Sequence, residues 1–271
     1  MKKEESTSGF SAMFAFIVVP VAFIVGILTY VYVLGNPHNF QGGDIEKEPV
    51  KDGIEHWFGV IHKGGLIVPI LLSLLLTVII FTVERFVTII KATGSQNINV
   101  FSRNIKNKLD TGDVQGAMLA CDKQKGSIAN VARAGLAKYK EMSENHELAK
   151  DQKVLAIQKE FEEATTLELP MLEKNLVVLS TISSVATLVG LLGTVIGMIK
   201  AFSAMANAGA PDASALSTGI SEALINTALG IGTSILAIVF YNMFTTRIDK
   251  LTYGIDESGY SITQTFAAKH S

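Results

Sequence analysis

The stretch from Ala213 to Phe244 is a long apolar run that contains a single ionised side chain, Glu222. A run of about 18 or more apolar residues is long enough to cross a lipid bilayer as a helix. A carboxylate at the centre of such a helix costs roughly 2.5–3.5 kcal/mol, because hydrocarbon does not solvate its charge. Protonation, a cationic partner or a water-filled cavity must therefore offset the burial of Glu222.

Three other stretches are apolar and long enough to span a membrane, namely 10–35, 64–90 and 176–206. The first follows a short polar tail, residues 1–9, so a signal peptide is the alternative interpretation. We expect a retained helix, because its apolar core is too long for a signal peptide and no small-residue cleavage site follows it. Together with 213–244, these runs predict an all-α membrane protein with four transmembrane helices.

Residues 36–63 form the loop that follows the first run. The end of this loop places four apolar side chains on one helical face, Ile54, Trp57, Phe58 and Ile61. This spacing predicts a short helix that lies in the membrane interface, with a soluble turn as the alternative. His56 and His62 are six residues apart, and we expect both of them at the surface.

Residues 91–175 hold most of the Lys and Arg residues and no further apolar run, so they predict a large helical domain outside the membrane. Within it, Asp113 is expected to cap the N-terminus of one helix. A long helix is expected from about Leu148, with Pro170 bending it.

The distribution of positive charge predicts the orientation in the membrane. Lys and Arg are frequent in 91–175 and present in the polar tail 245–271, whereas the turn 207–212 has neither. Because cytoplasmic segments carry the excess of positive charge, we expect this domain and both termini in the cytoplasm. The 36–63 loop and the 207–212 turn then face the periplasm, and the chain is a multi-pass protein of a bacterial inner membrane.

Composition argues against several classes of function. The net charge is -2 and no basic patch with interleaved aromatic residues occurs, so we expect no nucleic-acid partner. The five histidines are scattered, and no Ser/His/Asp set or glycine-rich phosphate loop is present, so we expect neither an enzyme nor a metal or cofactor. The single cysteine, Cys121, is expected to be a small buried hydrophobic residue.

Small and polar residues in the last run recur at steps of three and four, which places them in one stripe on a helix: Gly219, Glu222, Asn226, Gly230 and Thr233. Thr227 borders this stripe. The preceding run has a stripe of its own, Gly190, Gly193, Thr194 and Gly197, whose small residues allow close approach of another helix. If the two runs are antiparallel, Thr194 is level with Thr227, and Lys200 is close in depth to Glu222.

Two interpretations of this polar set remain open. Burial favours the neutral form of a carboxyl group, so Glu222 is a candidate reversible proton site, with the hydroxyls of Thr194 and Thr227 along the ion path. This interpretation requires that Glu222 has no permanent cationic partner, with Lys200 reaching to the interface. The alternative is a fixed ion pair between Lys200 and Glu222 that locks two helices together. Asn226 and the glycines Gly190, Gly193, Gly197 and Gly230 fit helix packing as well as an ion path.

Two segments in the last two runs resemble the MotA/TolQ/ExbB proton-channel family, and ExbB most closely. They are Gly190-Leu-Leu-Gly-Thr-Val-Ile-Gly-Met-Ile-Lys-Ala-Phe202 and Gly219-Ile-Ser-Glu-Ala-Leu-Ile-Asn-Thr-Ala-Leu-Gly230, with Tyr241-Asn242 closing the second. The resemblance extends more weakly over about 64–250. It does not cover the first predicted helix, and Leu236 stands where the family usually has a proline.

The resemblance implies a homopentamer around the membrane helices of an ExbD-like one-span partner, which brings an aspartate for the proton path. It identifies Glu222 with the family's pore-facing glutamate, and Thr194 and Thr227 with its two polar threonines. The complex would use the proton motive force to drive a TonB-like protein for outer-membrane transport. A TolQ-like or motility-type stator subunit and a passive membrane scaffold with a paired Glu222 are the alternatives.

Overall fold

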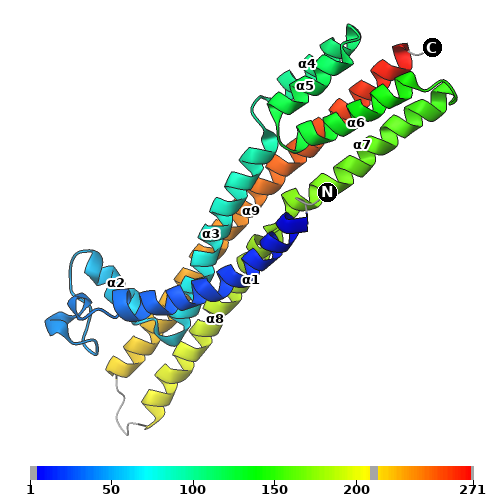
Figure 1. Cartoon of the computed structure of the whole chain (residues 1–271). Helices are drawn as coiled ribbons and strands as arrows, with labels where there is room; N and C mark the ends of the chain where they lie inside the picture. The colour runs from blue at the N-terminus through cyan, green and yellow to red at the C-terminus, as the bar shows by residue number, and fades with distance from the viewer. Residues whose placement is uncertain (1–4, 208–212, 270–271) are drawn as a thin grey trace. The chain divides into compact units, whose positions relative to one another are not determined.

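The computed structural model describes residues 5–207 and 213–269, with side chains from Phe16 and from Ser214 onward. The predicted 207–212 turn therefore falls almost entirely outside the described residues. Figure 1 shows nine labelled α-helices: α1 (Glu5–Leu28), α2 (Ile54–His62), α3 (Val68–Thr93), α4 (Ile98–Asp110), α5 (Val114–Gln124), α6 (Ser127–Glu144), α7 (Lys150–Glu173), α8 (Leu176–Asn207) and α9 (Ala213–Lys269). Short helical turns join some of them: η1 (Thr29–Leu34), η2 (Pro37–Asn39), η3 (Gln41–Gly43) and η4 (Gly65–Ile67).

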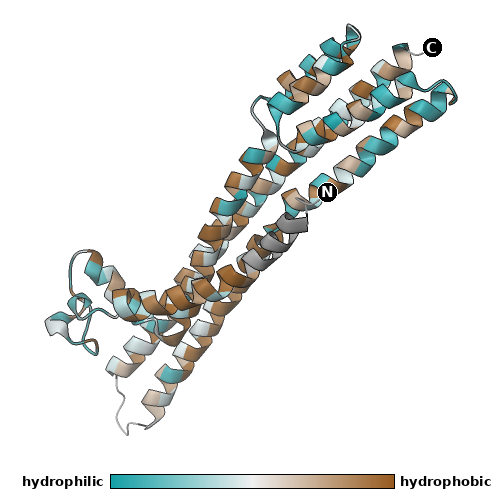
Figure 2. Ribbon diagram, in the orientation of Figure 1, coloured by the Kyte–Doolittle hydropathy of each residue, from teal (hydrophilic) through white to brown (hydrophobic). Residues whose placement is uncertain are grey.

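The predicted fold class is confirmed. Four stretches of the described chain are long and apolar enough to cross a membrane, namely Phe16–Leu34 and windows within Gly65–Asp110, Lys150–Ala206 and Ser214–Lys269. Figure 2 shows hydrophobic residues along α3, α8 and the first half of α9, and many more hydrophilic residues on α4 to α7. The chain divides into two compact units, of which the first holds 1–83 and 177–241 and the second holds 84–176 and 242–271.

In the first unit, α1 packs closely on the start of α3. A Cβ atom at Gly26 would lie 2.9 Å from the Pro69 carbonyl oxygen and would overlap the Ser73 hydroxyl, so glycine is required for this approach. Ala22 is buried on the same side, whereas Phe16 is 82% exposed. One face of α1 is therefore a helix contact, whereas another face is exposed on the single chain.

The segment between α1 and α3 is folded back onto the end of η1. The Asn39 amide donates hydrogen bonds to the carbonyl oxygens of Val33 and Leu34 at 2.8 and 2.9 Å. Phe40 is buried and lies edge-on to the ring of His62, with centroids 5.6 Å apart. The predicted helix at the end of this segment is α2. The surface position predicted for His62 is wrong, because its ring packs between aromatic side chains, with Nδ1 shielded from solvent.

The second unit has a hydrophobic core of its own, which unites α4, α5, α6, α7 and the C-terminal part of α9. Its largest fully buried side chains include Phe101, Leu109, Leu136, Ile157 and Phe266. Asp113 caps α5 as predicted, because its carboxylate accepts a hydrogen bond of 2.7 Å from the Gly116 amide. Cys121 is buried in this core as predicted, and burial raises the pKa of its thiol to about 12.

The change in polarity at Phe244 does not end the last helix. The α9 helix continues to Lys269, and Ile255, Ile262 and Phe266 contribute to the core of the second unit. The sequence-based description of 245–271 as a polar tail therefore missed an amphipathic helix, although the apolar residues recur at helical spacing. At its end, the Lys269 ammonium donates to the carbonyl oxygen of Asp110 at 2.7 Å, at the C-terminus of α4.

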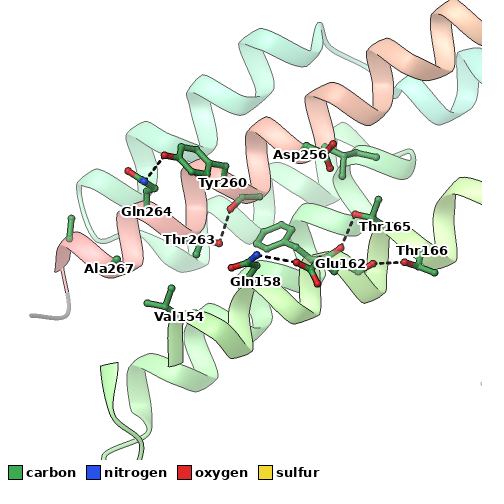
Figure 3. A pocket seen from close by; sticks show the side chains of 14 residues that line it. Val154, Gln158, Glu162, Thr165, Thr166, Asp256, Tyr260, Thr263, Gln264 and Ala267 are labelled. Carbon is green, nitrogen blue, oxygen red and sulfur yellow. Dashed lines mark hydrogen bonds between the residues drawn. The ribbon is translucent and has the colours of Figure 1, made fainter. Parts of the chain in front are cut away.

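Between α7 and the end of α9, the second unit has a groove of about 850 Å³ (Figure 3). Phe161 and Ile255 supply apolar lining, and the polar lining includes Glu162, Asp256 and Tyr260. Several lining side chains are already hydrogen-bonded within their own helices, including Gln158 to Glu162 at 3.0 Å and Gln264 to Tyr260 at 2.6 Å. The groove and the Glu222 carboxylate belong to different units.

Candidate ion site in the membrane helices

Glu222 lies on the buried face of α9. Its relative exposure is 8%, and the other members of its predicted stripe, Gly219, Asn226, Gly230 and Thr233, are also buried. The helical spacing in the sequence therefore predicted the packed face of α9 correctly. Residues between these positions, such as Leu224 and Ile231, are exposed on the single chain.

The glycines of α8 and α9 bring the two helices into backbone contact. A Cβ atom at Gly190 would lie 2.9 Å from the Asn226 carbonyl oxygen, and one at Gly197 would lie 2.8 Å from the Gly219 carbonyl oxygen. One at Gly230 would lie 2.6 Å from the Ala186 carbonyl oxygen. The structure therefore supports the packing interpretation of these glycines, since any side chain would separate the helices.

Thr194 and Thr227 meet across this interface, as the antiparallel register predicts. Their hydroxyl oxygens form a hydrogen bond, and Thr194 also donates toward the Gly190 carbonyl oxygen at 3.3 Å. Both side chains are half-buried. The two hydroxyls thus form a hydrogen-bonded polar pair at this helix contact.

Lys200 does not reach away to the interface as predicted, because its side chain turns toward α9. Its Nζ atom lies 2.7 Å from Glu222 Oε1, so the carboxylate has a cationic partner in this structure. The expectation of an unpaired acid is therefore wrong for this conformation. The Lys200 side chain is nevertheless 50% exposed, whereas that of Glu222 is 10% exposed. Of the two partners, only the acid is buried in the single chain.

A second contact to Glu222 comes from the turn between α2 and α3. Gly65 has a φ of +75°, and a Cβ atom there would overlap Glu222 Oε1, so the backbone of this turn lies directly against the carboxylate. The preceding residue, Gly64, is held by the Asn226 amide, which donates to its carbonyl oxygen at 2.9 Å. The sequence analysis missed this turn, although two successive glycines before an apolar run are a signal for unusual backbone conformation.

Tyr30, from the end of the first predicted span, supports the same turn. Its ring stacks on His62 with centroids 4.4 Å apart, and its hydroxyl donates to the His62 carbonyl oxygen at 3.2 Å. Outside the membrane-spanning segments, burial lowers the pKa of His62, and the nearby charge of Lys63 acts in the same direction. The N-terminal segment is therefore part of the surroundings of Glu222.

This arrangement suits the handling of small cations more than bond-making chemistry. A buried carboxylate, an ammonium group and hydroxyls at a helix interface offer sites that gain and lose protons or bind water. No group of three or more His, Cys, Asp or Glu side chains suited to a metal ion occurs among the described residues.

Comparison with known proteins identifies the segment that carries this site. Residues 123–257 match the sequence model of the MotA/TolQ/ExbB proton channel family. This range includes Thr194, Lys200, Glu222 and Thr227, and it excludes Tyr30 and the Gly64–Gly65 turn. The resemblance inferred from the two motifs is thereby confirmed, and over this range the chain belongs to the MotA/TolQ/ExbB family.

Individual relatives agree with this assignment. The chain is 41% identical over 85 residues, 31% of its length, to the putative biopolymer transport protein ExbB-like 3 of Synechocystis. It is 30% identical over 124 residues, 46% of its length, to the Tol-Pal system protein TolQ of Pseudomonas aeruginosa. It is 44% identical over 71 residues, 26% of its length, to the biopolymer transport protein ExbB of Pseudomonas putida. These matches span 40%, 54% and 22% of the respective relatives.

Proposed function

We propose that this chain is an ion-conducting subunit of an ExbB-like energiser in a bacterial inner membrane. In this proposal it forms a homo-oligomer, a pentamer by resemblance, around a one-span ExbD-like partner. The assembly uses the proton motive force to do work on a TonB-like protein that serves outer-membrane transport. Both termini and the second unit face the cytoplasm, in keeping with the distribution of Lys and Arg.

The observation that carries this proposal is the burial of Glu222 at the contact between α8 and α9, within the segment that matches the family. A buried acid in a membrane helix is costly, so its retention favours a functional role. The adjoining hydroxyls of Thr194 and Thr227 extend the polar surface along the same interface.

The Lys200 contact determines how such a site must operate. The carboxylate cannot carry a proton while it is ionised and paired, so the ammonium group must leave when a proton arrives. In this proposal the ammonium group moves away toward the surface of the single chain, on which half of the Lys200 side chain lies. We infer that ion passage alternates between a lysine-paired carboxylate and a protonated, neutral carboxyl group.

The same contact also supports a second candidate function. If Lys200 never leaves Glu222, the pair is a static link between α8 and α9, and the chain is a passive membrane scaffold. The pair is short, at 2.7 Å, which a static link also requires. A TolQ-like role in envelope integrity is a variant of the first proposal, and neighbouring genes for a TolA-like or a TonB-like protein separate the two.

The experiment compares ion flux and assembly in the same preparation. The assembly is purified from its native membrane with its partners, its subunits are counted by native mass spectrometry, and proton flux is measured in vesicles that contain a pH-sensitive dye. We expect Glu222→Gln to keep the subunit count and to reduce flux at least tenfold. Glu257→Gln, an exposed position of the same helix, is the matched control and should conduct normally.

The scaffold predicts a different pattern. Lys200→Ala and Glu222→Ala should each disrupt assembly, because each leaves one charge of the link unpaired, and the double variant should restore it. Normal flux through an intact Glu222→Gln assembly contradicts the proposed function.

A further inference from the structure

Asn226 is a fully buried polar residue next to Glu222 on α9. It lies four residues further along α9, one helical turn away on the same face. Its relative exposure is 0%, which makes it more deeply buried than the acid. A Cβ atom at Gly193 would lie 2.5 Å from Asn226 Cβ and 2.9 Å from its Nδ2, so α8 has a glycine where this side chain needs space.

One end of the Asn226 side chain is already engaged. Its Nδ2 atom donates to the Gly64 carbonyl oxygen at 2.9 Å, which anchors the turn that lies against Glu222. A carbonyl oxygen accepts hydrogen bonds only, so the amide group must present its NH₂ end to Gly64. The orientation of the amide follows, and its oxygen points elsewhere.

The side-chain oxygen of Asn226, Oδ1, lacks a hydrogen-bond partner in the described part of the chain that would explain its burial. Asn226 Oδ1 is buried and has no hydrogen-bond donor among the described residues of the chain. A buried polar atom without a partner is costly, and most such atoms in proteins are bonded to protein or water. An apolar side chain at this position would avoid the cost, yet the chain has an asparagine here, between Ile225 and Thr227.

We propose that Asn226 is part of the ion path. Its side-chain carbonyl oxygen holds the water molecule that passes protons to and from Glu222. The inference rests on the proposed function. The amide nitrogen keeps the Gly64–Gly65 turn against the carboxylate. The amide oxygen accepts a hydrogen bond from a water, which remains free to exchange a proton with Glu222 on its other side. Asn226 thereby acts both as a positioning residue and as part of the path.

Water fits this position better than a bound metal cation. Hard cations prefer six or more oxygen ligands, whereas a water needs two to four polar partners. Asn226 Oδ1 offers one unoccupied acceptor for such a water, and the Glu222 carboxylate, one helical turn away on α9, already holds the Lys200 ammonium. The charged or titratable groups that contact or act on this site are Glu222 and Lys200, and Tyr30 at the turn.

Two substitutions in the purified assembly test the role of Asn226. Asn226→Leu has similar bulk but neither donor nor acceptor, and we expect proton flux to fall at least tenfold with an unchanged subunit count. Asn226→Asp keeps an acceptor oxygen, and in its protonated form it also donates to Gly64. We therefore expect it to conduct, with a pH profile that differs from the wild type. Asn242→Leu, at an exposed position of α9, is the matched control.

A second readout separates this inference from the proposed function. Carbodiimide labelling of Glu222, followed by mass spectrometry, reports whether the acid still becomes protonated. We expect labelling of Asn226→Leu at equilibrium within about twofold of the wild type, because the acid remains while the path beyond it is broken. If Glu222→Gln blocks flux but Asn226→Leu conducts within twofold of the wild type, this inference fails and the proposed function stands. If Glu222→Gln conducts normally, the proposed function fails first.

The remaining outcomes are also decisive. Should Asn226→Leu fail to assemble, Asn226→Asp decides alone: a changed pH profile supports the inference and an unchanged one overturns it. Replacing sodium by choline in the vesicle experiment should leave the flux unchanged. Flux that requires sodium would overturn the water-borne route and assign Asn226 Oδ1 to a metal cation.

Discussion

Two Glu–cation pairs in this protein have opposite patterns of burial. In the first unit, the acid Glu222 is buried and Lys200 is half exposed. In the second unit, Arg85 is 3% exposed and its partner Glu84 is 24% exposed. Arg85 also donates to the Leu172 carbonyl oxygen at 3.2 Å. The buried member is therefore the titratable acid in one pair and a permanently charged guanidinium group in the other.

This difference separates a structural pair from one suited to exchange. An arginine does not lose its proton in a protein, and a planar guanidinium group with several bonded donors is fixed in place. A lysine has one ammonium group on a flexible stem, so it leaves a partner more readily when solvent is near. Glu84 and Arg85 are neighbours on α3, and Arg85 joins α3 to α7 through its bond to Leu172, whereas Lys200 and Glu222 join α8 to α9 directly.

The largest expected effect is that of Arg85→Ala. It leaves the Leu172 carbonyl oxygen of α7 without this donor and Glu84 without its cationic partner, and breaking a buried pair costs about 3–5 kcal/mol. Lys200→Ala should cost less, about 1–3 kcal/mol, because a proton can neutralise the buried carboxyl group that it leaves unpaired. Denaturation of the detergent-solubilised chain, followed by circular dichroism, gives both values. Equal losses would contradict the proposed difference between the pairs.

Two glycine substitutions compare the packing of the two units. A Cβ atom at Gly135 would overlap the ring of Phe161 in the core of the second unit, so Gly135→Ala should destabilise by about 1–3 kcal/mol. Gly232 on α9 has no atom within 4 Å of such a Cβ atom. Gly232→Ala should therefore be neutral or stabilise the helix by up to about 1 kcal/mol. The same denaturation experiment measures both, and a loss at Gly232 would reveal a contact that the single chain lacks.

Lowering the pH is expected to have a smaller effect, on the stability of the turn beside Glu222. Burial lowers the pKa of His62 from 6.5, so the folded segment binds a proton less readily than the unfolded one. Stability is complete above pH 6.5 and falls as the pH drops from 6.5 through the lowered pKa. The fluorescence of Trp57, the single tryptophan, should report the loosening of α2. In His62→Gln the pH dependence should disappear, and its persistence would assign the change to another group.

The smallest expected effect lies in the second unit, at the cap of α5. The hydrogen bond from the Gly116 amide holds the pKa of Asp113 below its ordinary value of 3.8. The cap is therefore fully effective above pH 3.8 and is lost as the pH falls through the lowered pKa. The protection factor of the Gly116 amide, its exchange rate relative to that of an unstructured amide at the same pH, should fall in acid. Asp113→Asn accepts the same bond without ionising, so its protection factor should lack this pH dependence.

The sequence by itself determined which residues share a face. Apolar length predicted the four spans, helical spacing predicted the buried stripe through Glu222, and antiparallel counting predicted the contact between Thr194 and Thr227. These features follow from a fixed rise and a fixed angle per residue in a helix, so local periodicity is sufficient to predict them.

The tertiary structure alone decided what surrounds Glu222. Counting placed Lys200 close in depth to the acid, but the direction of its flexible side chain depends on the balance between solvent and carboxylate. The contacts of Gly65 with Glu222 and of Gly64 with Asn226 join residues more than 150 positions apart, which no local pattern encodes. The helical spacing of Ile255, Ile262 and Phe266 indicates the continuation of α9 past Phe244, but the core that these residues complete is built mostly from other helices. Periodicity thus sets the faces of helices, whereas contacts between distant segments depend on the free energy of the whole packed unit.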